Sequence, residues 1–165
     1  MYVEFADGER VELKRFHIMD GLGIQMLRWA GLHVSLVSGR ASRATALRAE
    51  ELGVECLQEG SRKAPVVERI LHREGAGWEE LAMVADDLAD LPVMRKAGLP
   101  VAVANAAPEI LAQARWTTSR AGGEGAVRDF AEALLGARGE WDRLVEAYRR
   151  SREEGGDVPS WLEAT

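Results

Sequence analysis

Three aspartates lie close together in the segment MVADDLADLP, at residues 83–92. Asp86, Asp87 and Asp90 fall within five positions and follow a short apolar run. Like charges at this spacing repel one another, and Mg²⁺ would relieve the repulsion because it prefers carboxylate and water oxygens as ligands. We therefore predict a Mg²⁺ site at these residues. The ordinary alternative is a turn or helix cap, in which an aspartate side chain binds the backbone.

Two further groups are suited to binding an anion. Ser38, Gly39 and Arg40 follow the apolar run VSLV and precede an expected helix, so a hydroxyl and backbone N–H groups can face a phosphate. Lys63 opens another expected helix and supplies a movable positive charge. A metal, a lysine and a phosphate-binding hydroxyl are the parts of a phosphoryl-transfer site. Each also has a plain explanation, because Ser-Gly pairs form turns and surface lysines are common.

The elements that would position these groups alternate between strand and helix. After a hairpin formed by residues 1–5 and 10–16, we expect helices over residues 20–31, 42–53, 63–75, 89–98 and 108–114, and a glycine-interrupted helical segment over 125–154. Strands are expected over residues 32–39, 54–60, 81–87, 100–106 and 115–119. This alternation is typical of an α/β layer fold with a mostly parallel sheet. Ligands of such sheets bind beyond the carboxyl ends of the strands, where the candidate residues fall.

Composition narrows the class of protein further. The 165 residues carry a formal net charge of −6, which argues against a nucleic-acid partner. No apolar run reaches the roughly 18 residues of a membrane span. The single cysteine, Cys56, fits a reducing, cytoplasmic compartment. We expect one domain over residues 1–150 and a loose tail over 151–165.

Several segments of the chain together resemble a known family. They are RFHIMDGLGIQMLRWAGLHVSLVSGR, Lys63, VADDLADLPVMRKAGLPVAVANAAPEI and TTSRAGGEGAVRDFAEALLGARGEWD. They are similar to the 3-deoxy-D-manno-octulosonate 8-phosphate (KDO 8-phosphate) phosphatases, which are small, capless members of the haloacid dehalogenase superfamily. The likeness covers about residues 2–142. The phosphatase-like domain fused to some acylneuraminate cytidylyltransferases is a close relative.

This resemblance implies a fold, an activity and an assembly. The expected fold is a three-layer Rossmannoid α/β domain with a small N-terminal hairpin and no cap. The expected activity is Mg²⁺-dependent hydrolysis of a sugar-acid phosphate monoester through an aspartyl-phosphate. The family also implies a homotetramer in which a neighbouring subunit helps to close each active site.

The resemblance also implies roles for individual residues. Ser38 and Gly39, with Arg40, would hold the phosphoryl group, and Lys63 would neutralise its charge. Asp86 would be a direct metal ligand, Asp87 would support it directly or through water, and Asp90 would fix the loop geometry. Three further residues match positions near the substrate pocket or subunit contacts: Asp20, Gly21 and Arg128.

The chain departs from the family at its nucleophile. The family begins with a strand that ends in Asp-x-Asp-Gly-x-Leu-Thr-Asp-Gly, whose first aspartate is the nucleophile. No Asp-x-Asp occurs in these 165 residues, and Asp7 falls in the expected hairpin turn. We therefore expect no phosphatase turnover from this chain alone. Smaller departures are Met19, Ala85 and Ala89, where the family has a basic residue, glycine and asparagine.

The same segment matters for the sheet, because in this superfamily its strand lies in the middle. Without it, the strands expected over residues 32–39 and 81–87 lack a neighbour, and unpaired buried backbone groups cost about 1–3 kcal/mol each. Either the two strands pair directly, or another segment fills the place, or the natural protein extends further upstream, which we favour.

Three functions remain open at this point. The first is a sugar-acid phosphatase represented by an incomplete chain. The second is a non-catalytic relative that keeps the scaffold, and the substitutions at Met19, Ala85 and Ala89 favour it. The third is an unrelated α/β phosphate-binding or phospho-receiver domain. In a receiver the acid pair comes first along the chain, whereas here it comes last.

Overall fold

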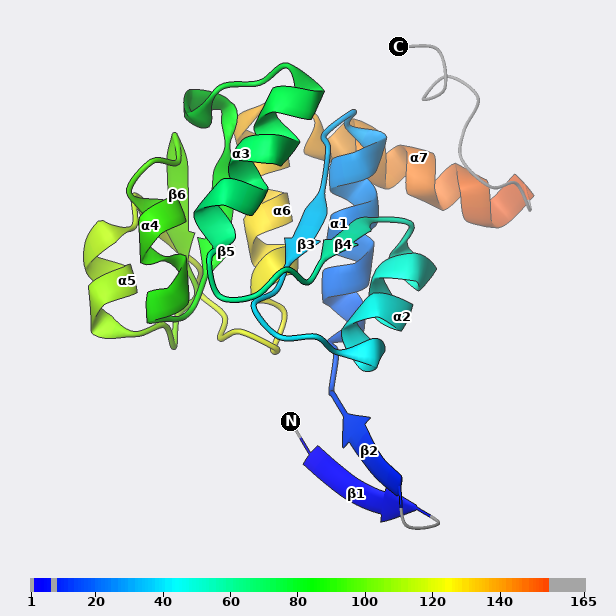
Figure 1. The fold of residues 1–165 in the computed structure, drawn as a ribbon. Coiled ribbons are helices and arrows are strands. Elements are labelled where there is room, and N and C mark those ends of the chain that lie inside the picture. Colours follow the sequence, from blue (N-terminus) through cyan, green and yellow to red (C-terminus); the bar gives the residue numbers. More distant parts are fainter. Residues whose placement is uncertain (1, 7–8, 155–165) are drawn as a thin grey trace.

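The first described elements form an antiparallel hairpin that projects from the rest of the molecule (Figure 1). In the computed structural model, which describes residues 2–6 and 9–154, strand β1 (Tyr2–Ala6) pairs with β2 (Glu9–Leu13). This confirms the predicted hairpin, although its turn at residues 7–8 lies outside the described residues. The hairpin is thus an appendage rather than part of the main sheet.

The remaining strands form two separate parallel sheets. One contains β3 (Ser35–Val37) and β4 (Glu55–Leu57), and the other has the order β5 (Ala82–Ala85), β6 (Leu99–Ala102) and β7 (Trp116–Thr117). The predicted parallel α/β arrangement is therefore confirmed. Strands β3 and β5 do not pair, so the possibility that these two strands close up directly is wrong. Within the described part of the chain, no other strand lies between them.

The burial of the strands agrees with their division into two separate sheets. In β6 the last three residues are buried, as in a central strand, whereas every residue of β3 is only half-buried. Strand β5 is also half-buried at Met83 and Val84. This half-burial fits two strands that each lack a pairing partner on one edge within the described residues.

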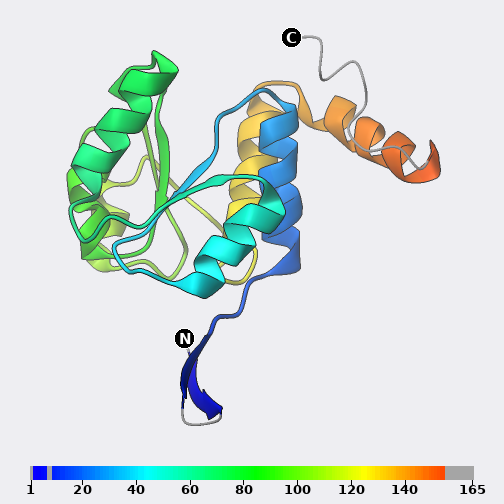
Figure 2. The ribbon, with the colours of Figure 1, turned by 45° about the vertical axis from the view of Figure 1, so that its right-hand side comes forward.

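Helices cover both sides of the strands and give three layers (Figure 2). Helices α1 (Ile18–Trp29) and α6 (Ala126–Ala137) lie together on one side, and α3 (Lys63–Glu74) lies on the other. The remaining helical elements are α2 (Arg43–Leu52), η1 (Trp78–Glu80), η2 (Leu88–Asp90), α4 (Leu91–Met94), α5 (Pro108–Gln113) and α7 (Trp141–Glu154). This is the capless three-layer fold that the sequence predicts.

The two faces of β5 show how the layers are packed. Side chains alternate across a strand, so neighbouring residues face opposite layers. Val84 packs against the cluster built by α1 and α6, which includes Leu27 and Phe130. Met83 packs against Val67 of α3 and the fully buried Val93 of α4. The apolar run before the aspartates therefore anchors both layers of the core.

Local signals fix several helix ends where the sequence predicts them. Ser42 caps α2 by accepting a hydrogen bond from the Thr45 N–H, and Gly53 ends that helix in the left-handed region at φ +63°. Gly139, at φ +71°, lies in the break between α6 and α7. Helix α7 continues to Glu154, four residues beyond the expected domain boundary, and residues 155–165 of the expected tail lie outside the described residues.

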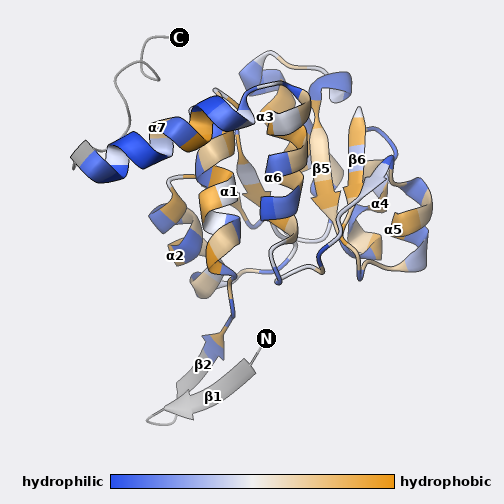
Figure 3. Cartoon of the chain, turned by 180° about the vertical axis from the view of Figure 1, so that it is seen from behind, coloured by the Kyte–Doolittle hydropathy of each residue, from blue (hydrophilic) through white to orange (hydrophobic). Residues whose placement is uncertain are grey.

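Helix α7 leads away from the body and is mostly hydrophilic (Figure 3). Its first half is anchored by Leu144 and Ala147, which are buried against the core of α1 and α6. Beyond them, Arg149 pairs with Glu146 and Glu153 along the exposed helix surface. Among the helices described, none has both the length and the apolar character that crossing a membrane requires.

Candidate active site at the carboxyl ends of the strands

A buried ion pair joins the two sheets at their carboxyl edge. Lys63, the first residue of α3, donates through Nζ to Asp90 Oδ1 at 2.6 Å. Asp90 ends η2 just after β5 and is only 3% exposed, whereas α3 follows β4 in the other sheet. Both residues follow the carboxyl ends of strands, as the sequence predicts, and they are in direct contact.

Two opposing effects act on the Asp90 carboxyl. Burial raises its pKa, because the charged form loses its hydration. The hydrogen bond and positive charge of Lys63 act in the opposite direction, while the charges of Asp86 and Asp87 raise the pKa further. The pKa of Asp90 lies above its ordinary value, because the loss of hydration on burial outweighs the stabilising contact with Lys63.

The other two aspartates have different environments. Asp87 accepts a hydrogen bond from the Leu88 N–H at 2.8 Å and caps η2, which is the helix-cap alternative foreseen for this segment. Asp86 is exposed directly after β5; its backbone carbonyl accepts from the Ala107 N–H at 2.8 Å. No hydrogen bond or ion pair of the Asp86 carboxylate occurs within the described residues, so it is available to a ligand.

The three aspartates do not assemble into a three-carboxylate metal site. Asp90 is paired with Lys63, and among the described residues no three or more His, Cys, Asp or Glu side chains lie close enough together to hold a metal ion. A site with one or two protein carboxylates, completed by water and phosphate oxygens, remains the prediction.

Ser38 and its neighbours form a tight loop after β3. The Ser38 N–H continues the ladder by donating to Leu57 O at 2.8 Å, and its hydroxyl lies 3.2 Å from the Arg40 N and 2.9 Å from the Arg40 O. A side chain at Gly39 would meet Gly60 and Ser61 at 3.4 Å, so a small residue suits this position. The serine thus shapes the turn, as the plain alternative predicts, at the edge where phosphate binding is also expected.

Asp20 and Arg128 link two helices in this structure, and Gly21 packs closely against Arg48 of α2. Asp20 Oδ1 accepts from the Arg128 N–H at 2.9 Å, which ties the first turn of α1 to that of α6. The Arg128 guanidinium pairs with Glu132 at 2.6 Å and lies over the Trp141 ring. None of the hydrogen bonds or ion pairs in the described part joins these three residues to the Lys63–Asp90 pair.

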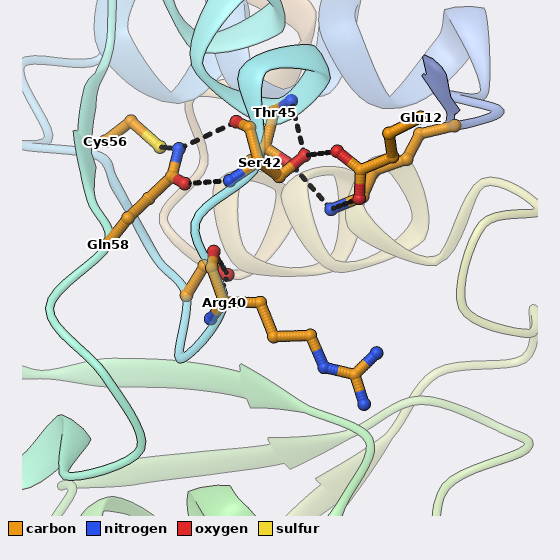
Figure 4. A network of polar contacts seen from close by, with 8 residues as sticks. Glu12, Arg40, Ser42, Thr45, Cys56 and Gln58 are labelled. Carbon is orange, nitrogen blue, oxygen red and sulfur yellow. Dashed lines mark hydrogen bonds and ion pairs between the residues drawn. The ribbon is translucent and has the colours of Figure 1, made fainter. Parts of the chain in front are cut away.

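One polar cluster at this edge was not predicted from the sequence. Ser42 is the first residue of the helix expected over residues 42–53, and it also contacts Glu12 of β2 and Gln58 beyond β4 (Figure 4). Glu12 and Gln58 lie 30 and 16 positions from Ser42 along the chain. No periodicity or local motif signals contacts at such separations.

A pocket of about 540 Å³ lies at the opposite edge of the strands. Its lining includes Trp29, His33 and Glu55, at the amino ends of β3 and β4. His33 is held there by Ser35 at 2.8 Å and Glu74 at 3.5 Å. This pocket contains none of the residues that the sequence selects for phosphate chemistry.

Comparison with known proteins identifies the class to which this fold and edge belong. Residues 42–129, which contain the Ser42 cap, Lys63 and all three aspartates, match the family of haloacid dehalogenase-like hydrolases. The chain is 39% identical over 132 residues to the 3-deoxy-D-manno-octulosonate 8-phosphate phosphatase KdsC of Escherichia coli K12, a match that covers 79% of this chain and 70% of that one. The protein belongs to the KDO 8-phosphate phosphatase family of these hydrolases.

Solved structures agree with this assignment. The KDO 8-phosphate phosphatase of Moraxella catarrhalis, in complex with a magnesium ion, a phosphate ion and a KDO molecule, superposes with a TM-score of 0.83 at 30% identity. That match covers 89% of this chain and 84% of the other. A probable YrbI family phosphatase from Pseudomonas syringae gives a TM-score of 0.80 at 36% identity, with the same coverage.

Proposed function

We propose that the carboxyl edge of the strands binds the phosphate of a 3-deoxy sugar acid together with Mg²⁺, as part of a KDO 8-phosphate phosphatase. The observation that carries this proposal is the buried Lys63–Asp90 pair with the unpartnered Asp86 carboxylate beside it. Positive charge for a phosphate and a free oxygen ligand for a hard cation then occur at one sheet edge. The names of the relatives support the choice of substrate.

The proposal gives each residue a role. Lys63 neutralises charge on the phosphoryl group. Gly39 offers it an N–H donor, and the Ser38 hydroxyl turns to it from the Arg40 carbonyl that it now contacts at 2.9 Å. Arg40 extends into solvent to meet the rest of the anion. Asp90 holds Lys63 in place.

The acids that remain suit a hydrated metal ion. Mg²⁺ usually keeps several waters and is bound by one or two carboxylates plus substrate phosphate, which fits an exposed Asp86 supported by Asp87. When bound, the ion would offset negative charge on the phosphoryl oxygens.

The chain's own sequence limits the reaction that we assign to it. No Asp-x-Asp occurs in the 165 residues, and covalent phosphoryl transfer needs a placed nucleophile. We therefore propose substrate and metal binding, and no turnover, for this chain on its own. A second candidate, a non-catalytic relative or the phosphatase-like domain associated with acylneuraminate cytidylyltransferases, is favoured by Ala85 and Ala89 beside the acids.

Assembly and surroundings complete the proposal. We propose a cytoplasmic homotetramer with the β1–β2 hairpins at its centre and with neighbouring subunits closing each site. Asp20, Gly21 and Arg128 would lie near the substrate pocket or these subunit contacts. Neither nucleic acid nor membrane is a proposed partner.

Calorimetric titration of KDO 8-phosphate tests the proposal, with and without Mg²⁺. We expect binding that Mg²⁺ strengthens, and we expect Asp86→Ala to remove that Mg²⁺ effect. Glu68→Ala, which removes an exposed carboxylate from α3, is the charge-matched control and should behave like the unsubstituted chain. Absence of binding, or an equal Mg²⁺ effect in both variants, would overturn the proposed site. Rapid Mg²⁺-dependent hydrolysis by the 165-residue chain would overturn the assignment of no turnover.

A further inference from the structure

The loop from Ser38 to Ser42, which carries the proposed phosphate donors, is fastened at both ends. At its start, the Ser38 N–H belongs to the ladder between β3 and β4. At its end, Ser42 is only 5% exposed and is held by a group that we call the Ser42 network. This network consists of Glu12, Lys14, Ser42, Thr45 and Gln58.

Gln58 holds the backbone of Ser42 through the oxygen and the nitrogen of its side-chain amide. Its Oε1 accepts from the Ser42 N–H, and its Nε2 donates to Ser42 O at 3.0 Å. A single side chain beyond β4 thus satisfies both backbone groups of the residue that closes the loop. Ser42 O also accepts from the Ala46 N–H at 3.1 Å, so loss of Gln58 would leave the Ser42 N–H without a partner among the described residues and loosen this end of the loop.

Glu12 holds the side chain of the same residue from the hairpin. The Ser42 hydroxyl donates to Glu12 Oε2 at 2.5 Å while it accepts from the Thr45 N–H at 3.2 Å. Lys14 supports both partners, because its Nζ donates to Thr45 Oγ1 at 2.8 Å and lies 3.7 Å from Glu12 Oε1. Capping α2 needs only the Thr45 contact, so the charge-assisted bond to Glu12 is an additional restraint.

The restraint comes from outside the body of the molecule. Glu12 belongs to β2, and the hairpin projects away from the layers that form the core (Figure 1). Arg40 in the middle of the loop points away from the Ser42 network (Figure 4). The network therefore holds the loop at its Ser42 end and leaves the side toward which Arg40 points free for phosphate.

We infer that Glu12 and Gln58 are positioning residues that hold the Ser38–Ser42 loop in its phosphate-binding conformation, so that the hairpin and the phosphate site are coupled. This inference rests on the proposed function. It follows that whatever fixes the hairpin in space also fixes Glu12, and through it the loop.

The test is a titration of the full chain with inorganic phosphate, followed by the backbone amide signals of Ser38, Gly39 and Arg40 in NMR spectra well below the melting temperature. We expect Glu12→Ala to weaken phosphate binding about tenfold, the size expected for loss of a hydrogen bond to a charged group. Glu12→Gln should restore most of the affinity, because an amide oxygen still accepts from Ser42. Gln58→Ala should weaken binding independently and serves if Glu12→Ala fails to fold.

Arg15→Ala is the matched control. Arg15 follows the hairpin and pairs with Glu124 before α6, so its loss removes a contact of the hairpin region that does not involve the loop. We expect unchanged phosphate affinity in this variant. Faster hydrogen exchange at the Arg40 and Ala41 amides should accompany Glu12→Ala but not Arg15→Ala.

Two failures are distinguishable. Phosphate binding that is the same in the unsubstituted chain, Glu12→Ala and Gln58→Ala would overturn this inference and leave the proposed function standing. No response of the loop amides to phosphate in the unsubstituted chain would overturn the proposed function, and the inference with it.

Discussion

Replacing Lys63 by methionine should destabilise the fold strongly at neutral pH. Methionine keeps most of the apolar stem but removes the ammonium group that pairs with Asp90 at 2.6 Å. The Asp90 carboxylate is 3% exposed and would be left with Asp86 and Asp87 as its charged neighbours. Removing one partner of a buried ion pair costs about 3–5 kcal/mol, because the other charge stays buried without compensation. We expect a loss of that order at pH 7.

The loss should depend on pH in a definite direction. Burial already raises the pKa of Asp90 above its unfolded value of 3.8, and Lys63 is the group that lowers it. In Lys63→Met the pKa therefore rises further. A carboxyl with a raised folded pKa destabilises the fold at pH values above that pKa, and the penalty fades as pH falls through it toward the unfolded value. The cost of the substitution should shrink between neutral pH and about pH 4.

Urea unfolding followed by circular dichroism measures this cost at each pH. Arg69→Met is the control, because Arg69 lies on the same helix and its ion pair with Glu59 is exposed. We expect little change in that variant at any pH. A double-mutant cycle with Asp90→Asn should show coupling between the two residues. A Lys63→Met cost no larger than the Arg69→Met cost, or one that does not fall on acidification, would refute this account of the pair.

Three further predictions concern packing, metal binding and assembly. Gly23→Ala should cost about 1–3 kcal/mol in urea unfolding, because the added Cβ would lie 2.9 Å from the Arg128 Cα of the packed helix α6; an unchanged midpoint would contradict this tight packing. Millimolar Mg²⁺ should barely raise the melting temperature, because few carboxylates bind it without substrate phosphate, and Asp86→Ala should abolish any rise; an equal rise in both proteins would exclude these acids as ligands. Light scattering at micromolar concentration should give a homotetramer, and a clean monomer would contradict the proposed assembly.

Local chemistry explains which parts of the fold were predictable. The cap at Ser42 and the left-handed residues Gly53 and Gly139 act over one helical turn, so their signals are visible in a short stretch of sequence. The alternation of strands and helices has the same local origin, because period and turn residues distinguish the two. These signals sufficed to predict the parallel strands and the helices between them.

The placement of the candidate residues was predictable only to the level of one sheet edge. The rule for strand ends places Lys63 near the acids, but it does not determine which acid pairs with it. The structure pairs Lys63 with Asp90 and leaves Asp86 exposed. The family resemblance implied for Asp90 only a role in fixing the loop geometry. The contact between Glu12 and Ser42 depends on how distant segments pack in the folded chain, so no local sequence pattern predicts it.

Because β3 and β5 do not pair, the Lys63–Asp90 ion pair also has a structural role between the two sheets. Because no strand described here bridges the two sheets, the pair links the β3–β4 half to the half that contains β5, β6 and β7. The apolar contacts of Val37 and Met83 with the cluster around Val67 join the same two halves. A change at Lys63 therefore alters both the charge offered to a phosphate and the bond between the two halves. Loss of binding in a Lys63 variant can be attributed to lost charge only at a pH and temperature where unfolding measurements show the variant to be fully folded.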